Sequence, residues 1–455
     1  MVTIISCTKQ SFENVCDAES DTFFEILFIK YIIEDESVLC NIKQETIPPS
    51  FLSCPSNVIG NGVGFTEQMA TDGNRLNFTV EPPFPQGIGF GFLNASITGV
   101  YSEWKADRNL YKITVSNSKG SASCNYEPKW MGKLPKVTGF TACYDESGIA
   151  DPSCTLPTRQ DEALQLGILP SYAGPSLETG GEVTHDLVTG LTWTSCSQPS
   201  SGLNCLSGAK GTYTLPDAIT HCESLNALNG GLGFGGRTGW RVPEIEEIVS
   251  TFRWNASNPS IDLTYFPDTI PFNYKSKTYS NAGQTAQFYA TIIQSSIGGN
   301  NIGDAHYLRC VAGKEFPQAR KYIDNGNGTV LDLDTSLVWQ KCTAGYSNAN
   351  LCTGGGVTVM NWTNAINYCN SLNLAGKIWR LPNLSELMSL TDPRFFPAQA
   401  SLNPSFFPNT DPFNYWSSTS FIGDPELGSN VLFSGYSVGA NLKTISLNVR
   451  CVANH

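Results

Sequence analysis

Apolar and polar residues alternate over residues 47–128, broken by Gly, Asn and Pro, and this pattern predicts short β-strands rather than helices. The clearest alternation runs from Tyr111 to Asn117. An Asn-Ser-Lys-Gly turn at residues 117–120 then leads into a second polar-apolar run. Turn chemistry between two such runs favours a β-hairpin. We therefore expect an all-β domain over residues 47–128.

The pattern changes after residue 180, where strand-like and helix-like segments follow one another. Residues 322–340 carry an Asn-Gly turn flanked by alternating residues, which predicts a hairpin. Helical spacing follows, because four apolar residues fall on one face: Ala365, Ile366, Cys369 and Leu372. Residues 216–226 repeat that helical spacing. This part of the chain is therefore predicted to be α+β.

The α+β pattern occurs twice, about 146 residues apart. Trp193, Cys196, Cys205 and Cys222 have counterparts in Trp339, Cys342, Cys352 and Cys369. Each copy then carries a Trp-Arg-x-Pro segment, at Trp240–Pro243 and Trp379–Pro382, and closes on Arg-Cys-Val, at Arg309–Val311 and Arg450–Val452. Self-similarity at a fixed period predicts repeated domains. We expect copy 1 at 181–313, copy 2 at 319–455 and a connector rich in Pro, Gly, Ser and Thr at 129–180.

Composition and charge narrow the function classes. A chain of 455 residues is too long for one core, so two to four domains are expected. The net charge is −12 and no stretch clusters Lys and Arg. Nucleic-acid binding needs a basic footprint, so it is not expected. No segment is long and apolar enough to span a membrane, and no fold is predicted for the acidic N-terminal segment, residues 1–46.

The cysteines indicate disulfides in an oxidising, extracytoplasmic compartment. There are fifteen, at long repeated spacings and without a C-x-x-C pair, beside only four histidines. Cys54 and Cys124 bracket the β domain and could join its first and last strands. Cys143 and Cys154 are spaced for a local bridge, and Cys16 and Cys40 are expected to pair.

Cys7 would account for the odd number of cysteines. A short apolar run and a small residue precede it, which resembles the end of a bacterial lipoprotein signal, where the cysteine carries the lipid. The basic start and the longer apolar core of such a signal are absent. We expect a lipid anchor at Cys7, with the true start of the protein upstream of Met1. The alternative is a free cysteine in a disordered tail.

The all-β region resembles the immunoglobulin-like domains of bacterial surface proteins. The resemblance rests on Pro85-Gln86-Gly87-Ile88, on the turn from Asn94 to Gly99 and on the final hairpin from Tyr111 to Ala122. Tyr101 stands where the pattern has a glycine. The resemblance implies an immunoglobulin-like β-sandwich over residues 47–128.

The duplicated unit resembles the Lcl C-terminal domain family, a bacterial family of unknown function. Copy 2 matches nearly end to end, from its Asp-Asn-Gly turn through Trp379–Pro382 to Arg450–Val452. Copy 1 is degenerate, because it lacks that turn and has Lys275 and Lys277 where copy 2 has Trp416 and Ser418. The family is similar to C-type lectin-like folds and occurs on secreted or surface-attached bacterial proteins, some of which are adhesins. The resemblance implies two α+β C-type lectin-like domains.

The resemblance also implies a disulfide pattern and a place for ligands. In a lectin-like domain the first helix is tied to the last strand, which implies Cys222–Cys310 and Cys369–Cys451. The shorter pairs Cys196–Cys205 and Cys342–Cys352 would fix the loop after each first hairpin. Ligands would contact the loops between the Trp-Arg-x-Pro helix and the final cysteine strand. The candidate residues there are Tyr274, Lys275, Lys277, Tyr415, Trp416 and Ser417.

Duplication argues against catalysis. His221 corresponds to Tyr368 and His306 to Leu447, so no histidine is kept in both copies. The cysteines of the copies are expected to be consumed in disulfides, which removes a nucleophilic thiol. Asp332 and Asp334 lack the spaced oxygen ligands and distal Glu of a calcium loop. We expect no metal and no cofactor.

Three more pairs of duplicated residues are expected to have a structural role rather than a catalytic or binding one. They are Trp240 and Trp379, Arg241 and Arg380, and Glu247 and Glu386. The tryptophans are expected in the core, and each Arg is expected to form a partly buried pair with the Glu. The first functional hypothesis is a non-catalytic bacterial surface protein that binds a host protein, a matrix protein or a glycan. The alternative is a structural or assembly module of the cell envelope, and an enzyme is the weakest hypothesis.

Overall fold

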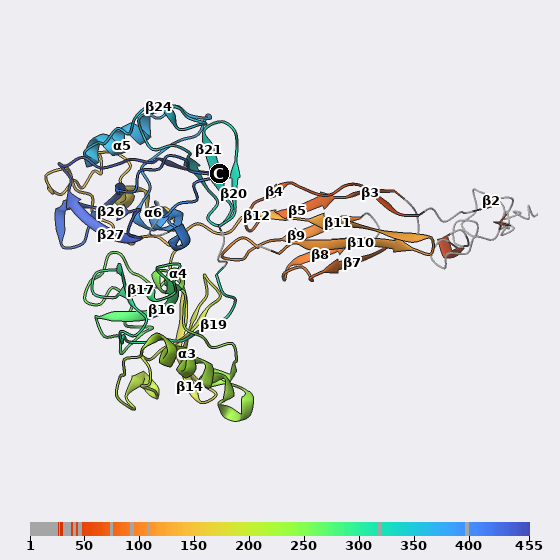
Figure 1. Cartoon of the computed structure of the whole chain (residues 1–455), viewed down its shortest axis with the longest axis horizontal. Helices are drawn as coiled ribbons and strands as arrows, with labels where there is room; N and C mark the ends of the chain where they lie inside the picture. Colours follow the sequence, from red (N-terminus) through yellow and green to blue (C-terminus); the bar gives the residue numbers. More distant parts are fainter. Residues whose placement is uncertain are drawn as a thin grey trace, which may run out of the picture. The chain divides into compact units, whose positions relative to one another are not determined.

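The computed structural model is multidomain and mostly β, with few helices (Figure 1). It describes residues 26, 28–30, 38–39, 42–43, 48–72, 76–91, 95–107, 109–316, 320–395 and 400–455. Cys7 and the expected Cys16–Cys40 pair lie outside these residues. The chain forms two compact units: the first ends at Trp130, and the second comprises Glu103–Ala106 and Met131–His455. None of the described helices has the length and apolar character needed to cross a membrane.

The first unit consists of β-strands, as the alternating pattern predicts, and its larger sheets are antiparallel. Its two three-stranded sheets have the orders β11-β10-β7 and β5-β9-β8. Their bounds are β5 Gly64–Gln68, β7 Asn77–Glu81, β8 Ile88–Gly91, β9 Ser96–Val100, β10 Tyr111–Asn117 and β11 Gly120–Tyr126. The expected hairpin is present, with Asn117 paired to Gly120 across the turn.

Shorter strands complete the first unit. These are β1 Val38–Leu39, β2 Ile42–Lys43, β3 Ser50–Ser53, β4 Val58–Ile59, β6 Ala70–Asp72 and β12 Lys129–Trp130. Both three-stranded sheets contribute to one apolar core, in which Trp130 is 1 % exposed and stacks on Tyr101. The Tyr126 hydroxyl donates to the buried carboxylate of Glu67 at 2.7 Å. Cys54 is bonded to Cys124, the pair that brackets this unit.

Both copies of the repeat contain one four-stranded sheet, one three-stranded sheet and two α-helices, and copy 2 adds the two-stranded sheet β23-β24. Copy 1 has the sheet β13-β14-β15-β19, the sheet β16-β17-β18 and helices α3 and α4. The bounds are β13 Tyr172–Glu178, β14 Gly181–Asp186, β15 Thr192–Thr194, α3 Leu215–Ser224, α4 Ile245–Val249, β16 Asn273–Tyr279, β17 Ala286–Thr291, β18 Ser296–Asn301 and β19 Val311–Ala312. Because β13 pairs with β14, the first sheet extends back to Tyr172, before the expected boundary at residue 181.

Copy 2 repeats this plan with the sheets β20-β21-β22-β28 and β25-β26-β27 and the helices α5 and α6. Its bounds are β20 Tyr322–Asp324, β21 Thr329–Asp332, β22 Leu337–Gln340, β23 Tyr346–Asn348, β24 Thr353–Gly355, α5 Trp362–Ser371, α6 Leu384–Leu390, β25 Asn414–Phe421, β26 Asp424–Leu432, β27 Ser437–Leu442 and β28 Val452–Asn454. Ala365, Ile366 and Cys369 of α5 are buried on one face, as the spacing predicts.

Disulfides tie both copies together at equivalent places. Cys222–Cys310 and Cys369–Cys451 join the first helix to the residue before the last strand, with Cα atoms 5.6 and 5.4 Å apart. Cys196–Cys205 and Cys342–Cys352 close the short loops, and Cys143–Cys154 closes a loop of the connector. All of these pairs are among those given by the sequence analysis. Disulfides in this number indicate an extracellular or secreted protein.

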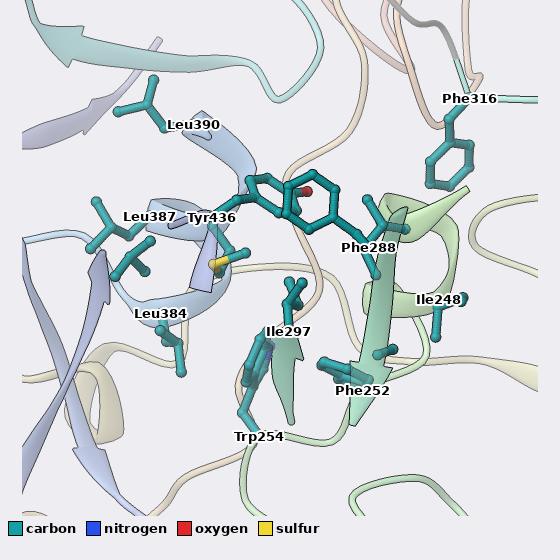
Figure 2. Packing of buried hydrophobic residues seen from close by; sticks show 14 of the residues in the cluster. Ile248, Phe252, Trp254, Phe288, Ile297, Phe316, Leu384, Leu387, Leu390 and Tyr436 are labelled. Carbon is teal, nitrogen blue, oxygen red and sulfur yellow. The ribbon is translucent and has the colours of Figure 1, made fainter. Parts of the chain in front are cut away.

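The two copies share one apolar core and do not form two independent domains. A single buried cluster includes Phe252 and Phe288 from copy 1 and Leu387 and Tyr436 from copy 2. Figure 2 shows the Tyr436 ring against Phe288, and their ring centroids are 5.2 Å apart. Leu384, Leu387 and Leu390 of α6 lie on the copy 2 side of this contact. The relative placement of the copies is therefore set by burial of apolar side chains.

The connector is an ordered part of the second unit. Its helix α2, Asp161–Leu164, packs on β25 of copy 2. Asp161 accepts hydrogen bonds from Thr138 at 2.5 Å and Thr419 at 2.7 Å, and Glu162 accepts one from the Ser420 amide at 2.8 Å. Residues just before α2 contact copy 1 as well, since the Asn255 side chain donates to the Gly139 carbonyl at 2.7 Å. The connector thus bridges the two copies.

Both carboxylates of α2 are buried and each has one oxygen without a hydrogen-bond partner among the described residues. Burial, with the nearby charge of Glu162, raises the pKa of Asp161 from 3.8 to about 7. The positive charge of Lys443 acts on Glu162 and partly offsets the rise in its pKa, and Lys443 is itself fully buried over the Trp362 ring at 4.1 Å. The connector contact therefore favours a protonated Asp161.

The contribution of Asp161 to the free energy of unfolding should fall as the pH rises from about 4 to about 7. A carboxyl whose pKa is raised by folding binds its proton more tightly in the folded state, so its contribution is complete below pH 3.8 and lost by about pH 7. The change is of the order of 4 kcal/mol for a shift of this size. Asp161→Asn should flatten this part of the curve of unfolding free energy against pH. Glu223→Gln, at an exposed position, serves as the control, and an unchanged slope in Asp161→Asn would contradict the assignment.

Candidate functional site

Five of the six residues expected to contact a ligand are core residues, which corrects that expectation. Tyr274 is 3 % exposed, and Lys275, Tyr415, Trp416 and Ser417 are fully buried. Lys277 is partly exposed, and its ammonium group lies 2.6 Å from Glu315. These residues occupy β16 and β25, the first strands of the second sheets, where consecutive side chains are buried because both faces of each strand are covered.

The two copies have different side chains at one equivalent buried position, Lys275 in copy 1 and Trp416 in copy 2. The Trp416 indole donates to the Met360 carbonyl at 2.8 Å, and Gly428 beside it leaves room, since a Cβ there would lie 3.0 Å from the indole. Copy 1 has Lys275 at the Trp416 position, and its ammonium group donates to the Asp304 carbonyl at 2.5 Å. Burial lowers the pKa of Lys275 to about 8. The difference between the copies is a difference in core filling.

The duplicated Arg-Cys-Val segments close each domain. Arg309 donates to the Thr194 carbonyl at 3.1 Å and to Asp268 at 3.1 Å, which joins the first hairpin to the loop before β16. Arg450 donates to the Gln340 carbonyl at 2.9 Å and to Thr410 at 2.8 Å. Both guanidinium groups are buried, so these arginines hold the fold together.

The duplicated Arg and Glu of the Trp-Arg-x-Pro segments also have a structural role, as expected. Arg380 forms two hydrogen bonds with Glu386, at 2.5 and 2.7 Å, and Arg241 forms the same pair with Glu247 at 2.6 and 2.7 Å. Each Glu also accepts the amide hydrogen of the residue that caps its helix. One carboxylate therefore starts the helix and neutralises the arginine.

Reactive side chains are engaged in structural contacts within the described part of the chain. The cysteines of both copies are paired in disulfides, so the one grouping with metal-like spacing, Glu182 with Cys196 and Cys205, offers no free thiolate. His306 packs on Tyr289, and burial lowers its pKa to about 4. His221 lies against Tyr213 and within 3.0 Å of Gln198.

An exposed phenylalanine stands at the same place in both copies. Phe272 is 54 % exposed and Phe413 is 63 % exposed, each directly before the first residue of β16 or β25. Both lie in a repeated Pro-Phe-Asn-Tyr sequence. Their backbones are held in place, since the Phe272 and Phe413 carbonyls accept hydrogen bonds from Ile292 and Phe433. We call these two segments, 271–273 and 412–414, the phenylalanine loops.

The repeated Pro-Phe-Asn-Tyr sequence was the available signal for these loops, and the sequence analysis missed it. The duplicated tryptophans and cysteines are all buried, so their duplication is explained by packing. Solvent exposure of a large aromatic ring has no such explanation. Exposed aromatic side chains are effective contact residues in binding surfaces.

A cavity of about 70 Å³ lies between the two copies. We call it the inter-repeat cleft. Its walls are mainly apolar and come from both copies and from the segment 103–106. The side chains that matter most are Trp104, Phe252, Trp254, Phe316, Met388 and Tyr436. The cleft is a direct consequence of the shared core, because the same contacts that hold the copies together form its walls.

Charged groups line one part of the inter-repeat cleft. Arg320 donates to Glu246 at 2.7 Å and to the Thr391 carbonyl at 2.7 Å, and Lys105 lies 3.8 Å from the same Glu246. Burial by itself would lower the pKa of Arg320, but Glu246 and further carboxylates outweigh it and raise that pKa. The guanidinium group is therefore a permanent cation, 4 % exposed.

The comparisons with known proteins agree with the internal duplication. The family model described as the Lcl C-terminal domain matches residues 182–312 and 328–453. No curated protein matches the sequence. Among solved structures, a chimeric titin Z1Z2 carrying an exogenous decorin peptide is 19 % identical and covers 19 % of this chain and 95 % of its own, with a TM-score of 0.16. The I-band fragment I67–I69 of titin is 11 % identical and covers 72 % and 86 %, with a TM-score of 0.17. Scores this low establish no shared fold.

Arg380→Met should lower the free energy of unfolding by about 3–5 kcal/mol, because it leaves the buried Glu386 without its partner. Arg380→Met combined with Glu386→Gln should recover much of that loss, since glutamine is neutral and still accepts the Asn383 amide hydrogen. Arg241→Met should cost less, because the Arg241 side chain is 17 % exposed against 4 % for Arg380. Urea unfolding of the three variants measures this order, and a loss below about 1 kcal/mol for Arg380→Met would contradict a buried pair.

Proposed function

The chain belongs to the Lcl C-terminal domain family, and we propose that it is a bacterial surface protein that binds a host protein, a matrix protein or a glycan without catalysis. In this proposal the two copies are C-type lectin-like domains. The β unit before them is an immunoglobulin-like spacer. A lipid at Cys7 anchors the chain to the outer membrane.

The observation that carries the proposal is the pair of phenylalanine loops. Phe272 and Phe413 are exposed at equivalent positions, in a protein whose duplicated tryptophans and cysteines are buried. They lie in the stretch between the Trp-Arg-x-Pro helix and the final cysteine strand, where lectin-like domains hold their ligand loops. The proposal therefore keeps the expected region and replaces the buried candidates Tyr274, Tyr415 and Trp416 with exposed residues.

Two equivalent loops on one rigid unit favour a ligand that repeats, such as a polymeric glycan or a fibrous matrix protein. The shared core fixes the two copies relative to each other, so the spacing between the two loops is fixed as well. A second contact made on the same ligand molecule benefits from high effective concentration and raises the overall affinity without any new chemistry. Weak single contacts are then sufficient for firm attachment.

Binding of the full chain to glycan and matrix-protein arrays tests the proposal. Phe272→Ala and Phe413→Ala should each weaken binding by roughly tenfold or more, because truncation of a contact aromatic typically costs more than 1 kcal/mol and the second contact is lost as well. The double variant should show no binding.

Ile378→Ala is the matched control. Ile378 is an exposed apolar residue, 76 % accessible, but its counterpart in copy 1 is Gly239, so it is not duplicated. Its loss should leave array binding unchanged. Equal binding by the double phenylalanine variant would reject these loops as the site. Absence of any array ligand together with self-association of the full chain would favour the alternative of an envelope assembly module.

A further inference from the structure

A wide cavity opens beside the phenylalanine loop of copy 2. Its volume is about 420 Å³, within the range of roughly 300–1,000 Å³ that is typical of small-molecule sites. Pro412 of the loop belongs to its lining, and the lining residue Asn409 is exposed to solvent. None of the described residues that line the cavity is charged. A ligand can therefore reach this lining from solvent, and the lining offers an ion no opposite charge.

Three asparagine side chains around Phe413 have an amide atom that makes no hydrogen bond within the described part of the chain. The Asn409 amide nitrogen donates to the Cys352 carbonyl at 3.0 Å, so the amide oxygen remains available. The Asn414 amide nitrogen lies 3.4 Å from the Asn441 oxygen, so the Asn414 oxygen and the Asn441 nitrogen remain available. All three side chains are exposed or partly exposed. Because an amide holds donors and acceptors side by side, these groups suit a ligand rich in hydroxyls.

Copy 1 closes the equivalent of Asn409 with internal hydrogen bonds. Asp268 stands at that position, and its carboxylate accepts hydrogen bonds from Ser200 at 2.6 Å and from Arg309 at 3.1 Å. The Asp268 side chain is only 5 % exposed. The neutral and exposed Asn409 therefore belongs to copy 2 alone.

The other two asparagines of copy 2 also differ from their counterparts in copy 1. These counterparts are Asn273 for Asn414 and Asn300 for Asn441. The Asn273 oxygen accepts a hydrogen bond from Thr291 at 2.9 Å, and copy 2 has Leu432 at the Thr291 position. The Asn300 nitrogen contacts the His306 ring, and copy 2 has Leu447 there. Copy 2 has thus replaced the internal partners of both amides with apolar side chains.

Charges near the loop disfavour an anionic ligand. Asp411 is partly exposed and lies directly between Thr410 of the cavity and the loop. Arg450 lies behind Thr410, but it is fully buried and its Nη atoms donate to protein oxygens. A carboxylate or sulfate group would therefore meet an exposed negative charge and, among the described residues named here, no accessible positive charge.

We infer that the phenylalanine loop of copy 2 binds a neutral glycan built of uncharged hexose units. The C–H face of one sugar ring packs on Phe413, which is 63 % exposed. Sugar hydroxyls exchange hydrogen bonds with Asn409, Asn414 and Asn441. An apolar contact with a few placed polar groups is the usual composition of such sites. This inference rests on the proposed function, because it narrows the ligand of the same loop from proteins and glycans to uncharged glycans.

Calorimetric titration of the full, disulfide-bonded chain tests the inference. The neutral probes are maltohexaose, cellohexaose, mannohexaose and galactohexaose, and the anionic probes are hexagalacturonate and a chondroitin sulfate hexasaccharide. At least one neutral probe should bind saturably. Both anionic probes should bind at least tenfold more weakly than that neutral probe.

Variants link this binding to the loop and its amides. Asn441→Asp keeps the oxygen that faces Asn414, removes the nitrogen donor and adds a charge. It should weaken binding of the neutral probe about three- to tenfold, as expected for one lost hydrogen bond. Asn367→Asp places the same charge on an exposed residue of α5 and should leave the affinity unchanged. Phe413→Ala should weaken binding more than Phe272→Ala does, because copy 1 uses its polar groups internally.

Three results would overturn the inference: no saturable binding of any neutral probe, an anionic probe that binds as tightly as the best neutral one, or full affinity in Asn441→Asp. The array experiment judges the proposed function separately. Array binding of a matrix protein that is lost in the double phenylalanine variant, without binding of any neutral hexasaccharide, would leave the proposed function standing and remove only this inference. Normal array binding by the double variant would instead remove the proposed function.

Discussion

The apolar contact between the two copies is the constraint on which the rest of the second unit depends. Phe288 and Tyr436 meet across it, and one continuous cluster of buried side chains extends into both copies. Burial of each large apolar side chain contributes about 1.5–3 kcal/mol relative to exposure. Rotation of one copy against the other would expose these side chains, so the copies are held in one arrangement. The inter-repeat cleft and the fixed spacing of the phenylalanine loops both follow from that arrangement.

Polar groups reinforce the same contact at some electrostatic cost. The connector places Asp161 and Glu162 against β25 of copy 2, and its preceding residues contact copy 1. Burial of two neighbouring carboxylates is unfavourable when both are charged. The connector therefore contributes most where Asp161 holds its proton. Its attachment is one pH-dependent part of the unit, alongside buried groups such as His306.

Local features could be predicted from the sequence because short-range patterns determine them. Helical spacing placed Ala365, Ile366 and Cys369 on one buried face, and turn chemistry at residues 117–120 predicted the β10–β11 hairpin. The pairs that tie each first helix to its last strand came from the family resemblance, and the structure contains them. The solvent exposure of single side chains was harder to predict from the sequence. Trp416 and Lys275 lie in apolar-polar runs that fit either face of a strand, and only tertiary packing places them inside.

The inter-repeat cleft could not be predicted at all, because it brings together residues far apart in the sequence. Trp104, Arg320 and Tyr436 come from three separate segments, and nothing in the local pattern of any of them indicates that they meet. The phenylalanine loops could have been predicted, because the Pro-Phe-Asn-Tyr motif occurs twice in the sequence. Three kinds of residue can be distinguished when the copies are compared. The first kind is duplicated and buried, such as the tryptophans and cysteines, and the second is duplicated and exposed, as Phe272 and Phe413 are. The third kind lines the inter-repeat cleft and is brought together only when the copies pack on each other. The first kind explains stability. The second kind is where packing alone leaves something unexplained, because an exposed ring at equivalent positions in both copies gains little from the core.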